Sequence, residues 1–386
     1  MKKCQSIVPP PNDPWYSPDM NITDPSHSAA EKSEFSSSEY QKMAKALNEL
    51  WETLWNKEEL DLEVLNHDGL KERLSELEIP KHATQQASLI GHMEKSGLLG
   101  VSKLVNGQNP SSTIIAEFGC GRAELSRYVA RSQFLTLAET NENQRTQSHR
   151  PFFLVDRAGP RMKFDTKILK DYQCDIDKIL AEEKEKSFNK DIKIPPPFVK
   201  RALIDIKDLN LNVALNNLFP NDLNSDVVAI SKHLCGCATD LTLQCLANNT
   251  STLKSIDKPT MTHKLKGLVI ALCCRQLCTY ETYPLVGRKF LIDSGLITTP
   301  DSFRLLTKMT SWALCGRRDD MATDEESVQN HFSGLSIKER EVAGFLARRA
   351  IDHGRLLSLC DMGYQSKLIR YVSPETSLEN VALIAQ

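Results

Sequence analysis

The chain has 386 residues, of which 40% are hydrophobic and 25% charged, and this composition suits one large or two smaller globular domains. Its formal net charge of -2 excludes an overall basic field that would attract nucleic acid, so any such binding has to come from a local patch. No apolar run is long enough to span a bilayer and no signal sequence opens the chain, so we expect an intracellular protein, cytoplasmic or nuclear, without a membrane partner.

The first hundred residues divide into two parts. Residues 1–38 are rich in Pro, Ser, Asn and Asp and have little hydrophobic periodicity, which predicts an extended or disordered leader that Trp15 and Tyr16 could pin to the body. Apolar residues then recur at helical spacing, which predicts amphipathic helices up to the first strand. We therefore expect a leader over 1–38, a helical extension over 39–100 and a main domain with insertions over 101–386.

The main domain begins with an apolar run, residues 113–118, that leads into a Gly-x-Gly turn at Gly119 and Gly121. This order predicts a buried strand ending in a turn where open α/β sheets bind nucleotide-like ligands. The third glycine of a dinucleotide fingerprint is missing, since Glu124 stands in its place. Glu117 favours a cationic ligand instead. S-adenosylmethionine fits, because Glu117 would face its positive methionine end while the glycines admit its backbone. A plain strand-to-helix turn is the alternative.

Four further strands are predicted along the chain, and acids end two of them. Asp156 ends the second strand, where an acid receives the ribose hydroxyls of a nucleoside, and Asp205 ends the third, placed to meet an adenine amino group. Helices are expected between the strands and, after Tyr280, at 303–312 and 336–353, followed by a hairpin. The strands lie at 152–157, 199–206, 226–230 and 267–272. This α/β alternation predicts a Rossmann-like, doubly wound sheet, the outline of a class I methyltransferase.

Lys232 and His233 directly follow the fourth predicted strand, at 226–230. Methyl transfer is an in-line displacement, so an enzyme mainly has to align the nucleophile, the methyl group and the sulfur. A hydroxyl nucleophile also gains from a base, or from a cation that stabilises the developing alkoxide. Lys232 and His233 are therefore our catalytic candidates, and a solvated loop is the alternative interpretation of the pair.

Cysteines gather after the fourth and fifth predicted strands, and eleven cysteines without a secretory signal indicate reduced thiols. Small buried residues at strand ends are the plainest interpretation. A thiolate that attacks carbon 6 of a pyrimidine is a chemical alternative, but no Pro-Cys or Thr-Cys pair occurs here. A zinc site that also uses His233 lacks C-x-x-C spacing, so no metal ligand is predicted. The cysteines concerned are Cys235, Cys237, Cys273, Cys274 and Cys278.

Several motifs between Lys81 and the C-terminus are distinctive. The longer ones are 118–129 (FGCGRAELSRYV), 231–236 (SKHLCG), 238–243 (ATDLTL) and 273–275 (CCR), and the shorter ones are 81–83 (KHA), 85–86 (QQ), 156–157 (DR), 337–341 (IKERE) and 370–372 (RYV). Together they closely resemble the eukaryotic tRNA 2'-O-methyltransferases that modify the fourth nucleotide of the acceptor stem. The resemblance implies a class I fold, S-adenosylmethionine as methyl donor and the ribose 2'-hydroxyl of certain tRNAs as acceptor.

Members of that family also carry N-terminal zinc fingers, one of which ends in Lys-Lys-Cys. The opening residues Met1-Lys2-Lys3-Cys4 look like the last fragment of such a finger. The other ligands are missing, so we expect a truncated or alternative-start form. Zinc is expected only where a complete finger is present, with Cys4 as a remnant ligand.

Binding to an acceptor stem needs a basic surface around the pocket, because duplex RNA is recognised through phosphates and 2'-hydroxyls. A merely solvated helix face is the alternative interpretation of the basic residues near the C-terminus. These residues are Arg317, Arg318, Lys338, Arg340, Arg348 and Arg349. The function predicted is tRNA ribose 2'-O-methylation. Its alternatives are a cysteine-dependent RNA cytosine-5 methyltransferase and a non-catalytic tRNA-binding subunit.

Overall fold

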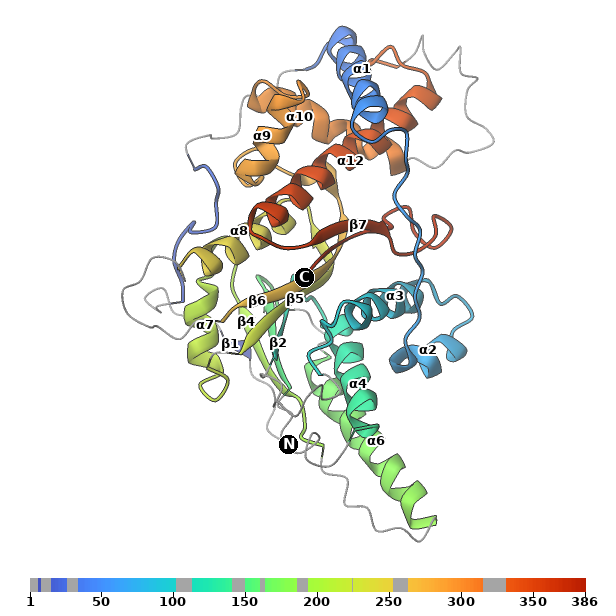
Figure 1. Ribbon diagram of the computed structural model, residues 1–386, viewed down its shortest axis with the longest axis vertical. Helices are drawn as coiled ribbons and strands as arrows, with labels where there is room; N and C mark the ends of the chain where they lie inside the picture. Colours follow the sequence, from blue (N-terminus) through green and yellow to red (C-terminus); the bar gives the residue numbers. More distant parts are fainter. Residues whose placement is uncertain are drawn as a thin grey trace.

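The computed structural model describes residues 6–7, 15–25, 34–101, 113–140, 150–159, 164–185, 194–223, 225–252, 263–314 and 331–386 (Figure 1). Arg317, Arg318 and Cys4, named above as candidates, lie outside these ranges. Within them, no helix is both long and apolar enough to cross a membrane.

One eight-stranded sheet forms the centre of the molecule, in the order β1-β4-β3-β2-β5-β6-β8-β7. Strands β2 to β6 run parallel, and β8 runs antiparallel to both β6 and β7. The strands are β1 (Ser6–Ile7), β2 (Thr113–Phe118), β3 (Pro151–Asp156), β4 (Phe198–Leu203), β5 (Asp226–Cys235), β6 (Leu265–Cys273), β7 (Ser366–Arg370) and β8 (Val381–Ala385). The predicted parallel strands and terminal hairpin are confirmed. Because the chain runs outward from β2 and returns at β5, a topological switch point lies between these two strands.

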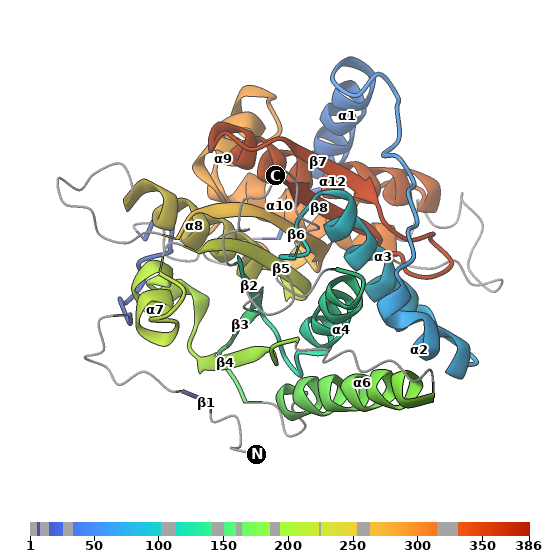
Figure 2. The ribbon, with the colours of Figure 1, turned by 60° about the horizontal axis from the view of Figure 1, so that its bottom comes forward.

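Helices cover both faces of this sheet, because successive strand residues point to opposite sides and both sets are apolar (Figure 2). Ile115 and Val228 pack under α3, α4 and α6, whereas Ile114 and Val227 pack under α7 and α8. The helices are α1 (Ser37–Thr53), α2 (Lys71–Glu76), α3 (Lys81–Lys95), α4 (Glu124–Ala138), α6 (Asp165–Glu185), α7 (Leu211–Leu218), α8 (Cys237–Thr252), α9 (Leu285–Asp293), α10 (Pro300–Met309) and α12 (Ile337–Asp361).

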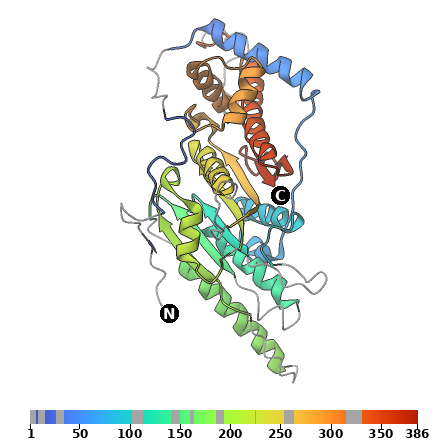
Figure 3. The ribbon, with the colours of Figure 1, turned by 60° about the vertical axis from the view of Figure 1, so that its left-hand side comes forward.

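A second apolar core joins α1 to the helices that follow the sheet. Tyr40 and Leu47 of α1 are fully buried against side chains of α9, α10 and α12. Figure 3 shows this helical layer at one end of the molecule and α6 at the other. We expected residues 39–100 to form one extension before the main domain. They instead contribute to two cores, since α1 packs in the helical layer while α3 covers the sheet. Helix α9 was not predicted.

Part of the expected leader is ordered. Trp15 is only 2% exposed and packs in the same apolar cluster as α7, and Tyr16 forms a β-bridge with Leu209. The side-chain amide of Asn21 donates hydrogen bonds to the carbonyl oxygens of Ile206 and Leu209. Trp15 and Tyr16 therefore pin this segment to the body, as expected, and residues 15–25 are not a disordered part of the leader. Their tertiary contacts supply the apolar burial that the local sequence lacks.

Candidate active site

The Gly-x-Gly turn between β2 and α4 lies at the switch point of the sheet. Gly119 and Gly121 have φ angles of +59° and +47°, and Ala123, which precedes α4, also has a positive φ of +61°. A Cβ atom at Gly119 would lie 2.9 Å from the Leu234 side chain of β5, whereas a Cβ atom at Gly121 would meet nothing within 4 Å. Gly119 therefore lets the turn pack against β5, and Gly121 leaves the turn open on its other side.

Asp156 and the glycine turn, which are distant in the sequence, meet in the structure. One carboxylate oxygen of Asp156 accepts a hydrogen bond of 2.8 Å from the Gly121 amide, and the other accepts one of 3.0 Å from the Ala158 amide. Asp205 follows β4 and caps the 3-10 turn Ile206–Asp208, because its carboxylate accepts from the Lys207 amide. Both acids thus lie at the carboxyl edge of the sheet, as their strand positions indicated.

Glu117 lies on β2, and its carboxylate is buried beneath the start of α4. Its Oε2 atom accepts hydrogen bonds from the amide and the hydroxyl of Ser126, at 3.1 and 2.5 Å. Burial raises the pKa of Glu117 to about 7, against the opposing effects of these hydrogen bonds and of Arg201. The hydrogen-bonded oxygen therefore faces the helix, where it holds α4 to the strand that carries the turn.

Arg201 is hydrogen-bonded to the glycine turn and was not predicted as a site residue. Its side chain on β4 is fully buried, and its Nη1 atom donates to the carbonyl oxygen of Gly121 at 2.8 Å and to the sulfur of Cys120 at 2.9 Å. Its other nitrogens donate to both carboxylate oxygens of Asp165, at 2.7 and 2.8 Å. The available signal was a pair of adjacent cations, Lys200 and Arg201, within the otherwise apolar strand FVKRAL.

The end of β5 carries the predicted catalytic pair. The strand extends to Cys235, five residues beyond its predicted end, with a register shift against β6 between Ser231 and Leu234. Lys232 and His233 are therefore strand residues, and the alternative of a solvated loop is wrong for Lys232, which is only 7% exposed. Continued pairing with β6 is what keeps this segment in the sheet.

Lys232 contacts His82, which lies in the first turn of α3. Its ammonium group donates a 3.2 Å hydrogen bond to the carbonyl oxygen of His82 and lies 3.4 Å from the Nδ1 atom of the same residue. Burial lowers the pKa of Lys232 to about 8, against the opposing charges of Glu124 and Glu117. A lysine with this pKa keeps a fraction of neutral amine at neutral pH, which makes it a candidate base.

His233 stands at the rim of the same site. Its ring is exposed and lies 6.5 Å from the His82 ring, measured between centroids. The surrounding protein removes part of its hydration, and this desolvation, with the charges of Lys232 and His82, lowers the pKa of His233. Lys232, His233 and His82 together form a basic group at the end of β5. The His233 carbonyl oxygen lies 3.4 Å from where a Cβ atom of Gly119 would stand, so this basic group adjoins the glycine turn.

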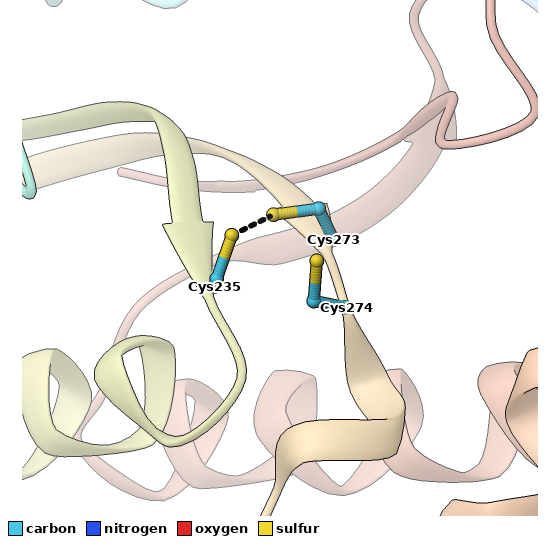
Figure 4. A group of neighbouring side chains, drawn as sticks. All are labelled: Cys235, Cys273 and Cys274. Atoms are coloured by element: carbon cyan, nitrogen blue, oxygen red, sulfur yellow. Dashed lines mark hydrogen bonds between the residues drawn. The ribbon is translucent and has the colours of Figure 1, made fainter.

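Three of the five clustered cysteines meet at the ends of β5 and β6 (Figure 4). The sulfurs of Cys235 and Cys273 are 3.6 Å apart, and the Cys274 sulfur completes a group whose members all lie within 4.8 Å. The hydrogen bond between the Cys235 and Cys273 thiols lowers the pKa of Cys235 to about 6 and raises that of Cys273. The other two lie elsewhere. Cys237 begins α8, and the buried Cys278 accepts from Arg355 at 3.0 Å.

Two of the motifs supply buried ion pairs rather than site residues. Arg355 of α12 donates to both carboxylate oxygens of Asp240, at 2.8 and 3.0 Å, and both side chains are fully buried. Arg275 donates to Asp352 and Glu379 and is also fully buried. These pairs join α12 to α8 and to the turn that follows β6. Sequence reasoning missed them, because partners more than 70 residues apart leave no local pattern.

The predicted basic surface is only partly exposed. Arg348 is only 6% exposed and pairs with Glu379, so its assignment to the surface is wrong: its side chain completes the buried ion pairs. Arg349 is half-buried, with its guanidinium over the rings of Trp51 and Trp55. Lys338 is exposed, in the first turn of α12.

Comparison with known proteins shows the family of this chain. Residues 84–386 match the family model described as Methyltransferase TRM13. A relative from Yarrowia lipolytica named tRNA:m(4)X modification enzyme TRM13 is 38% identical over 100% of this chain and 76% of its own length. Relatives of the same name from Scheffersomyces stipitis and Schizosaccharomyces pombe are 38% and 36% identical, over 99% and 100% of this chain and 84% and 89% of theirs. The chain therefore belongs to the TRM13 family of methyltransferases.

Proposed function

We propose that this protein transfers a methyl group from S-adenosylmethionine to the ribose 2'-hydroxyl of nucleotide 4 in the acceptor stem of a tRNA. Its membership of a methyltransferase family and the name of its relatives support methylation of tRNA. The observation that supports the ribose hydroxyl as acceptor is the buried Lys232 beside the glycine turn, whose pKa is lowered to about 8. A hydroxyl needs such a base, since it is a poor nucleophile while protonated.

The glycine turn and the two strand-end acids fit a nucleoside-bearing ligand. The open side of Gly121 leaves room for the ligand backbone, and Asp156 offers carboxylate oxygens beside it for ribose hydroxyls. Asp205, one strand further, would accept from the adenine amino group. Glu117, which holds α4 under the turn, would favour the cationic methionine end. S-adenosylmethionine supplies an electrophilic methyl carbon when it is bound there.

The basic group at the end of β5 would prepare the acceptor. The neutral amine of Lys232 would take the proton of the 2'-hydroxyl, and the His82 carbonyl holds that amine in place. His233, exposed at the rim, would orient the incoming ribose. Lys81 is exposed next to His82 and could receive a neighbouring phosphate. This division of roles leaves the buried groups for chemistry and the exposed groups for RNA contact.

Transfer of labelled methyl from S-adenosylmethionine to tRNA, with mass analysis of the product nucleosides, tests this proposal. We expect a ribose-methylated nucleoside from position 4, lost in Lys232→Ala. Lys266→Ala is the matched control, because Lys266 is an exposed lysine near the opposite end of the neighbouring strand β6. A methylated base, or full activity in Lys232→Ala, would contradict the proposal. Failure to bind S-adenosylmethionine would favour the non-catalytic tRNA-binding subunit.

One observation favours a second candidate, cysteine-dependent cytosine-5 methylation. Cys235 is exposed at the end of β5, and its lowered pKa of about 6 favours the thiolate that such an attack requires. This mechanism forms a covalent bond between the cysteine sulfur and carbon 6 of the base. The two candidates differ in product and intermediate. If the product is 5-methylcytidine, and a denaturant-resistant protein–RNA adduct forms that Cys235→Ala abolishes, the cytosine-5 mechanism would replace ribose methylation as the proposed function.

A further inference from the structure

Three thiols that are separated along the chain converge at one edge of the sheet. Cys235 ends β5, Cys273 ends β6, and Cys274 follows directly, and Figure 4 shows their sulfurs facing one another. Their sulfur atoms all lie within 4.8 Å. In the described part of the chain this is the one group of three or more Cys, His, Asp or Glu side chains spaced for a metal ion.

Two features of the backbone bring the thiols together. Cys235 and Cys273 are register partners on parallel neighbouring strands, so their side chains emerge side by side. Consecutive residues of a strand point to opposite faces, which would separate Cys273 from Cys274. Cys274 instead adopts a left-handed conformation, with φ +50° and ψ +43°, and so turns its sulfur back towards the other two. Its amide donates to the Glu379 carboxylate, which holds this unusual conformation in place.

The spacing of the sulfurs suits tetrahedral coordination. A zinc–sulfur bond of about 2.3 Å at tetrahedral angles requires sulfurs about 3.8 Å apart. Cys235 and Cys273 already have a separation of 3.6 Å. The Cys274 sulfur would have to move by at most about 1 Å to reach the same spacing, which a small side-chain rotation supplies. No backbone rearrangement is needed to seat an ion.

We propose that Cys235, Cys273 and Cys274 bind one Zn²⁺ ion through three thiolates, with a water molecule as the fourth ligand. Thiolates select soft or borderline cations such as zinc over magnesium or calcium. Cys235 is exposed and Cys274 half-buried, so the fourth position faces solvent. The buried Cys245, by comparison, donates to the Leu209 carbonyl oxygen and has no sulfur partner in this group.

Bound zinc would tie the ends of β5 and β6 together, three residues from Lys232. It would thereby keep in place the strand extension that carries the basic group of the candidate active site. The inference does not depend on the proposed function, because the ion binds without tRNA or S-adenosylmethionine, so the two can fail independently.

Metal titration of the full chain tests the proposal. Protein stripped with a chelator is titrated with Co²⁺, whose thiolate charge-transfer band reports sulfur ligands, and then with competing Zn²⁺. We expect one equivalent per chain and a band of three-thiolate intensity. Cys235→Ser and Cys274→Ser should each weaken cobalt binding at least tenfold. Cys360→Ser, which changes an exposed cysteine on α12, and Cys4→Ser are the matched controls and should keep the band.

Alkylation of the wild-type chain gives a second measurement that needs no variant to fold. Zinc should slow the modification of Cys235 and Cys274 at least tenfold, while exposed Cys174 and Cys360 react at the same rate with or without the ion. Absence of the charge-transfer band, a band lost in Cys4→Ser but kept in Cys235→Ser, or unprotected Cys235 would each overturn the proposal. So would a Cys235–Cys273 disulfide that persists in the purified, metal-loaded protein.

Discussion

The pH dependence of methyl transfer should follow the ionisation of Lys232. Burial lowers its pKa from 10.5 to about 8, which corresponds to about 3 kcal/mol of disfavoured charge. Because the folded pKa is depressed, the neutral amine grows from about a tenth of molecules at pH 7 to about half at pH 8. If this amine takes the hydroxyl proton, the rate should rise about tenfold from pH 6 to 7, about fivefold from pH 7 to 8, and level off above pH 9.

Single-turnover rates of methyl transfer between pH 6 and 9, with enzyme and S-adenosylmethionine in excess over tRNA, measure this dependence on the chemical step. Lys232→Ala should lose about 10²–10⁴-fold in rate and lose the rise with pH as well. Lys266→Ala should keep both the rate and the profile of the wild type, because its exposed side chain lies outside the site.

Two results would refute the reasoning. A rate that falls as the pH rises through 8 would mean that the ammonium form is active, acting as a cation that stabilises the alkoxide rather than as a base. A profile of the wild-type shape in Lys232→Ala would mean that another group titrates. His82 would then be the next residue to replace, since it is the direct partner of Lys232.

Three further predictions concern the glycine turn and its supports. The raised pKa of Glu117, about 7 against 4.5, adds stability that is full below pH 4.5 and lost as the pH rises through 7. Urea unfolding should therefore show a loss on the order of 3 kcal/mol between pH 5 and 8, and Glu117→Gln should remove this pH dependence. Arg201→Met should cost about 3–5 kcal/mol by leaving Asp165 buried and unpaired, and Arg201→Met/Asp165→Leu should recover most of it in the same assay; equal stability of the single and double variants would contradict this. Gly121→Ala should weaken S-adenosylmethionine binding in calorimetry at least tenfold, because its Cβ fills the open side of the turn, whereas Gly295→Ala, with a similar positive φ and open surroundings, should bind normally.

Local patterns were sufficient for strands β2 to β8 of the central sheet, but not for β1, which lies in the expected leader. Apolar runs of the length of 113–118 are typical of strands buried on both faces, and such runs could be placed without any contact being known. The position of each strand end then placed Asp156 and Asp205 at the same edge, because parallel strands share their carboxyl ends. Local patterns did not predict the length of β5. Pairing with β6 extends this strand to Cys235, and no residue near position 230 signals that extension.

The sequence by itself determined the sheet, the glycine turn and the residue types along its edge, since strand and turn propensities act over a few residues. Only the tertiary structure decided which groups meet. Lys232 is buried against a helix 150 residues away, Arg201 reaches the turn from a strand 80 residues beyond it, and three thiols converge from two strand ends. The burial that shifts the pKa of Lys232 and of Glu117 is a property of this packing, because desolvation depends on every element that surrounds a charge rather than on its neighbours in the chain.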